Sequence, residues 1–286
     1  MKQKVIGILY SGKEPGEDER LFLEIAKKKN LKVALLNIFK KIDEKRLKRY
    51  AKKCDIIYNT TAEDFSIEIV KTFEEYGKRI IESSESYYYL EDKWLFYLKC
   101  RQNRIPTPKT ILLSENIINA KKQLKEFGNW PVILKESCGT MGENVEKANK
   151  MPQVEEILRK FWKKKKAKFP IIAQEYIKSP SYRVTLIGNK IVQTALKSNK
   201  HGWKATGVYA KKCGKFKIDW KLKRIIDKLK EFVDIKICGI DFLKKDCKWF
   251  VLEVNAQPAF DFIDEERGKL ISETLDFLRK EASKKN

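Results

Sequence analysis

The sequence predicts an α/β protein with two or three subdomains. A strand–helix–strand pattern opens the chain, with apolar strands at residues 4–10 and 32–38 and an amphipathic helix at residues 18–29 between them. This order is typical of a parallel βαβ unit. Near the other end, residues 237–243 and 248–254 are rich in β-branched and aromatic side chains, which predicts a hairpin. The 286 residues, 42% of them hydrophobic, are enough for a sizeable core.

Charge and composition limit the function classes. Lys and Arg number 62 against 39 Asp and Glu, a formal net charge of +23. Such a field attracts ATP, an acidic substrate or nucleic acid, and a solvated lysine-rich surface without a partner is the alternative. The longest apolar runs are shorter than a membrane span or a signal-peptide core, so we expect a cytoplasmic protein with no membrane partner. Six cysteines and one histidine lack zinc-ligand spacing.

The first ninety residues are expected to form a small open α/β domain. After the βαβ unit come a basic helix at residues 43–53, a strand at 55–59 and a helix at 66–76, followed by an extended segment at 79–82. Ligands of such sheets bind beyond the carboxyl ends of the strands, here Tyr10-Ser11 and Tyr58-Asn59-Thr60.

The central segment contains a lysine in an unusual setting. One helix is predicted over residues 86–103 and another over 116–127. The apolar run of a strand at 130–136 is interrupted by Lys135, just before the strand ends at Glu136. A lysine inside an apolar strand is costly unless it faces an anion, so Lys135 is a candidate anion ligand. In the loop that follows, Gly139 and Gly142 would let backbone N–H groups approach phosphate oxygens.

The rest of the chain continues the alternation of helices and strands. A helix at residues 151–162 leads into four lysines, 163–166, that either contact nucleic acid or form a solvated loop. Strands are predicted at 170–176, 181–187 and 190–196, the last two joined by a Gly188-Asn189 turn. Helices at 220–233 and 265–282 complete the chain.

The predicted hairpin carries the acidic residues of interest. A three-residue turn, Lys245-Asp246-Cys247, sets residues of equal parity in its two arms on one face, so Asp241, Glu253 and Asn255 would project together. Two buried carboxylates side by side are unfavourable by several kcal/mol unless a cation neutralises them, and Mg²⁺ takes oxygen ligands. We therefore predict a Mg²⁺–nucleotide site; the alternative is a sheet with one solvated face.

Several motifs resemble those of one superfamily and follow its order. GIDFL followed by LEVNAQP resembles the metal-binding hairpin of the ATP-grasp superfamily. The segment LEDKWLFYLKCRQNRIPTPKT is similar to the entry to its lid domain, and SCGTMGENV to the loop that covers the triphosphate. QEYI is similar to the hinge between the lid and the C-terminal domain. The chain is most similar to the carboxylate–amine ligases that add glutamate to ribosomal protein or coenzymes and, more distantly, to D-alanine-D-alanine ligase.

The resemblance implies a fold and a reaction. It implies an ATP-grasp fold with an N-terminal α/β domain (residues 1–90), a central lid (91–173) and a C-terminal antiparallel-sheet subdomain with the metal site (174–286). ATP would phosphorylate a carboxylate, and an amine would displace phosphate from the acylphosphate to form an amide or peptide bond. The alternative function is a basic nucleic-acid- or ribosome-associated ATP-grasp protein without ligase turnover.

The resemblance also implies site residues, cofactors and partners. The cofactors would be ATP and Mg²⁺ (or Mn²⁺), and the partners a small-molecule, peptide or protein carboxylate and an amino-acid amine, possibly acidic. The implied catalytic residues are Arg183 and Lys135, and the implied metal ligands are Asp241, Glu253 and Asn255. The implied nucleotide contacts are Lys93, Lys135, Gly139, Gly142, Gln174, Glu175, Tyr176 and Ile177. The implied substrate contacts are His201 and Lys204.

Overall fold

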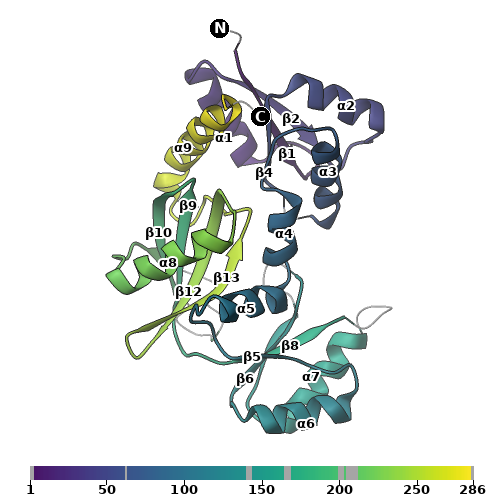
Figure 1. Cartoon of the computed structure of the whole chain (residues 1–286), viewed down its shortest axis with the longest axis vertical. Coiled ribbons are helices and arrows are strands. Elements are labelled where there is room, and N and C mark those ends of the chain that lie inside the picture. Colours follow the sequence, from purple (N-terminus) through teal and green to yellow (C-terminus); the bar gives the residue numbers. More distant parts are fainter. Residues whose placement is uncertain are drawn as a thin grey trace.

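The described residues form three β-sheets arranged along the long axis of the molecule (Figure 1). The computed structural model describes residues 3–61, 63–139, 144–163, 169–198, 203 and 212–284. The N-terminal sheet lies at one end, the central sheet at the other, and the C-terminal sheet between them. No helix within the described ranges is long and apolar enough to cross a membrane.

The N-terminal sheet is parallel, with strand order β2-β1-β3-β4. Its strands are β1 (Val5–Tyr10), β2 (Lys32–Asn37), β3 (Ile56–Asn59) and β4 (Ile80–Ile81), and its helices are α1 (Glu17–Lys28), α2 (Glu44–Lys53) and α3 (Asp64–Glu75). The parallel pairing of β1 with β2 confirms the predicted βαβ unit. The last helix, α9 (Asp264–Ala282), lies beside α1, and its Leu270 and Leu275 share a core with Ile6 and Ile8.

The predicted helix over residues 86–103 is wrong in one respect, because the structure divides it into two helices. These are α4 (Ser84–Leu90) and α5 (Lys93–Gln102). The Asp92 carboxylate accepts hydrogen bonds from the backbone N–H groups of Trp94 at 2.8 Å and Leu95 at 3.1 Å. A side chain that caps a new first turn favours a helix start over continuation, so Lys93 becomes the first residue of α5.

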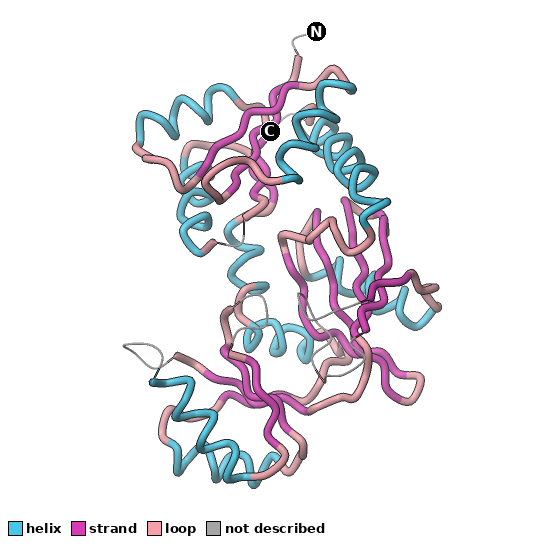
Figure 2. Tube along the Cα trace, turned by 180° about the vertical axis from the view of Figure 1, so that it is seen from behind, coloured by secondary structure: helices cyan, strands magenta, loops and turns pink. Residues whose placement is uncertain are grey.

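The central sheet is antiparallel, in the order β5-β8-β6-β7. Its strands are β5 (Thr110–Leu112), β6 (Val132–Glu136), β7 (Val145–Ala148) and β8 (Ile171–Glu175), with α6 (Ile117–Phe127) and α7 (Met151–Lys163) packed on one face. Figure 2, seen from behind, shows these helices on the outer side of the strands. Val132 and Leu134 enter the core beneath the helices, so Lys135 lies on the opposite face.

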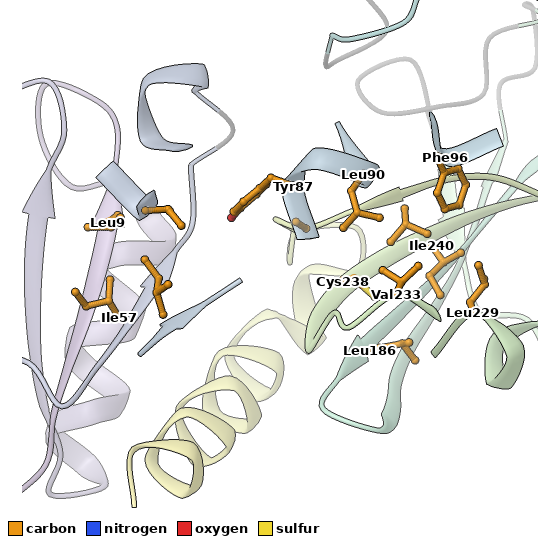
Figure 3. Packing of buried hydrophobic residues seen from close by; sticks show 14 of the residues in the cluster. Leu9, Ile57, Tyr87, Leu90, Phe96, Leu186, Leu229, Val233, Cys238 and Ile240 are labelled. Atoms are coloured by element: carbon orange, nitrogen blue, oxygen red, sulfur yellow. The ribbon is translucent and has the colours of Figure 1, made fainter. Parts of the chain in front are cut away.

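The C-terminal sheet is antiparallel, in the order β11-β10-β9-β12-β13. Its strands are β9 (Ser181–Ile187), β10 (Lys190–Ser198), β11 (Lys212–Gly214), β12 (Ile237–Lys245) and β13 (Lys248–Asn255), and α8 (Trp220–Phe232) covers one face. Figure 3 shows that the core beneath α8 continues past Leu90 and Tyr87 of α4 toward Leu9 and Ile57. The helix α4 therefore connects the N-terminal sheet to the hairpin β12–β13.

The hairpin turn differs from the predicted three-residue turn. Lys245 pairs with Lys248, and only Asp246 and Cys247 form the turn, both with positive φ (48° and 59°). A two-residue loop alone would pair residues of opposite parity, but the register shifts by one residue next to Asp241. Because of this β-bulge, Asp241 lies opposite Glu253 and Gly239 lies opposite Asn255.

The tight packing around Gly7, between the end of α2 and the N-terminal sheet, leads to a prediction about stability. A Cβ added at Gly7 would lie 2.9 Å from Cys54 Sγ and 3.1 Å from Ile57 Cγ1, and both neighbours are buried. Gly7→Ala should therefore overpack the core and destabilise the protein by roughly 1–3 kcal/mol. Gly268→Ala in α9 is the control, because no atom lies within 4 Å of its added Cβ and Ala favours a helix by about 1 kcal/mol. Equal midpoints of thermal unfolding for the two variants would contradict this packing argument.

Candidate active site

Lys135 is buried on the face of the central sheet that is free of helices. Its exposed fraction is 5%. The pKa of Lys135 is lowered to about 8, mainly by burial; Glu253 opposes this shift and Lys93 contributes to it. The structure therefore brings Lys135 of β6, Lys93 of α5 and Glu253 of β13 within electrostatic range of one another, although they come from three separate parts of the chain.

Lys93 is held against the loop that follows β6. Its backbone N–H donates to Ser137 O at 2.8 Å, and its ammonium donates to Gly139 O at 2.6 Å. Gly139 has φ of 143°, a conformation that L-residues rarely adopt. The first residue of α5 and the start of the predicted phosphate loop are thus in direct contact; Gly142 of that loop lies outside the described residues.

The predicted adenine segment lies at the end of β8. The Gln174 side chain donates to Thr110 Oγ1 at 2.9 Å. The N–H groups of Glu175 and Tyr176 donate to the carbonyls of Lys109 and Pro131. Ile177 is buried, and the ammonium of Lys147 lies 4.7 Å from the centre of the Tyr176 ring. These N–H groups already have partners, so an adenine edge would need other groups of this segment.

Asp241 lies at the centre of a buried ionic cluster. Lys197 Nζ lies 2.8 Å and Arg183 Nε 3.4 Å from its Oδ1. Burial alone would raise the pKa of Asp241, but Arg183 and Lys197 outweigh it and hold that pKa below its usual range. The Glu253 side chain is also a hydrogen-bond partner of Asp241, so the two carboxyl groups meet. Like charges in contact require a shared proton or a cation.

Lys197 is a site residue that the sequence analysis missed. Its side chain has an exposed fraction of 0%. The predicted strand ends at residue 196, one residue before Lys197, whereas β10 continues to Ser198 and so includes this lysine. A lysine buried in a strand is unfavourable without an anion, which is the argument that identified Lys135.

Gly239 gives Arg183 its place in the cluster. The guanidinium donates to Gly239 O at 2.7 Å, and a Cβ added at Gly239 would come within 2.3 Å of Arg183 Nη1. The ring of Phe262 lies 5.2 Å from Arg183 Cζ and 4.9 Å from Lys197 Nζ. A side chain at position 239 would therefore collide with the Arg183 guanidinium, which lies over Gly239 from the adjacent strand β9.

The donor set on the hairpin fits a divalent cation that is shared with phosphate. Asp241 and Glu253 offer facing carboxylates, and Asn255, whose Nδ2 donates to Gly239 O at 3.5 Å, lies two residues further along β13. Among the described residues there is no group of three or more His, Cys, Asp or Glu that could hold a metal ion. Mg²⁺ commonly binds through one or two carboxylates plus substrate phosphates, which matches this sparse set.

The predicted substrate contacts His201 and Lys204 lie outside the described residues. The same is true of residues 164–166 in the lysine run proposed as a nucleic-acid contact.

Two antiparallel sheets, one with the buried Lys135 and one with facing carboxylates, agree with the predicted ATP-grasp fold. A family model described as "RimK-like ATP-grasp domain" matches residues 90–275, and the chain belongs to this family. The predicted ATP-grasp fold and the predicted resemblance to ligases are both confirmed.

The similar curated proteins carry ligase names. The chain is 24% identical over 226 residues to a "Probable alpha-L-glutamate ligase" of Haemophilus influenzae, covering 77% of this chain and 73% of that protein. It is 29% identical over 203 residues to the "Coenzyme gamma-F420-2:alpha-L-glutamate ligase" of Methanococcus maripaludis, covering 68% of each. It is 30% identical over 168 residues to the "Alpha-aminoadipate--LysW ligase LysX" of Saccharolobus solfataricus, covering 57% and 60%.

Solved structures agree on the fold. A RimK domain ATP-grasp protein from Sphaerobacter thermophilus superposes with a TM-score of 0.76 at 13% identity, covering 96% of this chain and 98% of that one. The D-alanine--D-alanine ligase of Bacillus anthracis, in complex with ATP, gives 0.72 at 16% identity, covering 98% and 97%. At these identities the likeness establishes the fold alone.

The lowered pKa of Lys135 predicts a pH dependence of ATP binding. Below pH 8 the ammonium is charged and attracts phosphate; above pH 8 the nucleotide-free protein loses that charge. ATP affinity should therefore fall about tenfold between pH 7.5 and pH 9, as the charged fraction falls. Lys135→Arg stays protonated over this range and should show a much flatter dependence. Calorimetric dissociation constants with parallel pH dependences in the two proteins would contradict the assignment.

Proposed function

We propose that this protein is an ATP-dependent carboxylate–amine ligase that forms an amide or peptide bond through an acylphosphate. The observation that carries the proposal is the convergence of Lys93, Lys135 and Glu253 from three parts of the chain, with Asp241 facing Glu253. Positive groups for phosphates and oxygen donors for a cation are the two requirements of phosphoryl transfer from ATP. The ligase names of the curated relatives support this reaction class.

The proposed first step is the transfer of the γ-phosphoryl group. A substrate carboxylate oxygen attacks the γ-phosphorus, the bond to the β-phosphate oxygen breaks, and ADP leaves. Lys93 and Lys135 bind phosphate oxygens and offset their charge, while Arg183 orients the acylphosphate. Asp241, Glu253 and Asn255 would hold Mg²⁺, which when bound supplies neutralisation of phosphate charge.

The proposed second step forms the new C–N bond. The amine nitrogen attacks the acyl carbon, the bond from that carbon to the phosphate oxygen breaks, and the nitrogen releases a proton. Arg183 and Lys135 are buried, so the proposed site holds little water. Electrostatic interactions are stronger there, and hydrolysis of the acylphosphate competes less with attack by the amine.

We further propose that residues 1–90 form the substrate-side domain, 91–173 the lid, and 174–286 the subdomain with the metal site. The amine would be an amino acid, and the names of relatives favour glutamate as the first to test. A net charge of +23 favours an acidic acceptor.

The experiment measures ADP formation with ATP, Mg²⁺ and a panel of acidic and neutral amino acids with carboxylate acceptors. Wild-type protein should release ADP faster when both substrates are present. Glu253→Gln should lower turnover about a hundredfold or more, because it removes one carboxylate from the proposed cation site. Glu24→Gln, on the exposed side of α1, is the matched control and should match wild type.

Two results would contradict the proposal. The first is ligation by Glu253→Gln at the wild-type rate. The second is substrate-independent ADP release together with tight, strongly salt-dependent RNA binding, which would favour the nucleic-acid-associated alternative.

A further inference from the structure

The ammonium of Lys197 lies where it opposes a divalent cation. It is fully buried and donates to Asp241 Oδ1 at 2.8 Å, the same oxygen that Arg183 Nε approaches at 3.4 Å. Asp241 is also one of the proposed ligands of Mg²⁺. A cation bound to that carboxylate would lie within a few ångströms of the ammonium, and like charges repel strongly at such distances in a buried site.

Lys197 has an unused acceptor beside it. In the register of β9 and β10, Lys197 lies directly opposite Ser181. Ser181 Oγ is buried, and within the described part of the chain it has no hydrogen-bond partner. A buried hydroxyl without a partner is unfavourable, so it is available to receive the ammonium when Asp241 is engaged elsewhere.

The aromatic cover keeps the ammonium in the site. Phe262 lies over both Lys197 and Arg183, at 4.9 Å and 5.2 Å. A ring face stabilises a cation that has lost its water, so the ring helps to hold the ammonium in place as its partner changes.

We propose that Lys197 is the resident counter-cation of Asp241 and that it makes metal binding depend on the nucleotide. Without nucleotide, Lys197 neutralises Asp241 and disfavours a free divalent cation. When ATP binds, its phosphate charge offsets the repulsion, the metal binds to Asp241 and Glu253, and the ammonium turns toward Ser181 or the transferred phosphoryl group. Metal and nucleotide therefore bind together. This inference rests on the metal site proposed above and gives Lys197 a positioning role.

The test is calorimetric Mn²⁺ binding to the full-length protein without nucleotide, repeated with a non-hydrolysable ATP analogue. Wild type should bind Mn²⁺ weakly alone and much more tightly with the analogue. Lys197→Met, which keeps the length of the side chain and removes its charge, should bind Mn²⁺ alone about tenfold more tightly than wild type. Lys197→Arg, which keeps the charge, should behave like wild type.

The alternative roles of Lys197 give different results. If Lys197 only supported the packing of the site, Lys197→Met would bind Mn²⁺ more weakly. If it contacted only phosphate, Mn²⁺ binding without nucleotide would be unchanged. Either result would overturn the inference. If wild type failed to bind Mn²⁺ even with the analogue, the proposed metal site itself would fail, which separates the two conclusions.

A second measurement needs no neutral variant and remains informative if Lys197→Met does not fold. Nitrogen-15 NMR of lysine side chains in the wild type should show a slowly exchanging ammonium, assigned by its absence in Lys197→Arg. Addition of Mg²⁺ alone should leave this signal in place, and Mg²⁺ with the ATP analogue should shift it. A shift with Mg²⁺ alone, or no shift with both, would contradict the inference.

Discussion

The Asp241 carboxylate is buried between two cations, and the arrangement of this face of the C-terminal sheet follows from keeping that charge compensated. An unpaired buried carboxylate would be unfavourable by several kcal/mol, so Arg183 approaches it from the adjacent strand β9 and Lys197 from β10, the next strand in the sheet. Arg183 can do so only because Gly239 leaves room for its guanidinium. The bulge beside Asp241 then sets Glu253 opposite it.

The charges around this point explain why the site suits a metal–nucleotide complex. Lys93, Lys135, Arg183 and Lys197 set four positive charges against the three carboxyl groups of Asp241, Glu253 and Glu91. The cluster therefore has a surplus of positive charge before any ligand binds. A polyanion that carries its own divalent cation offsets this surplus, whereas a free metal ion increases it. The buried lysines lie on two sheets, so the nucleotide would also hold the central and C-terminal sheets together.

Local sequence patterns predicted most helices and strands, but they predicted the contacts between distant elements less well. The apolar runs located the strands, and a charged residue inside such a run identified Lys135. Lys197 lies one residue beyond the end of the predicted strand 190–196, whereas β10 continues to Ser198, so local spacing did not indicate that this lysine lies inside a strand. Asp92 is a residue type that commonly caps a helix start, which indicates a break at this position. The apolar residues on both sides of it nevertheless favoured one continuous helix.

Other features depend on contacts that sequence spacing does not encode. The predicted common face of Asp241 and Glu253 was argued from a three-residue turn. In the structure this common face arises differently: the two-residue turn shifts the pairing by one residue, and the bulge beside Asp241 shifts it back. Likewise, nothing in the pattern of α9 indicates that it returns to α1 instead of covering the hairpin, because an amphipathic face does not specify its partner.

The most direct test of the central claim is a crystal structure with ADP and Mn²⁺, in which anomalous scattering locates the metal. The account predicts one peak or more between Asp241, Glu253 and the β-phosphate, with Lys93 and Lys135 in contact with phosphate oxygens. Nucleotide bound elsewhere, or a metal with no contact to Asp241 or Glu253 while Lys197 keeps its ion pair, would contradict it.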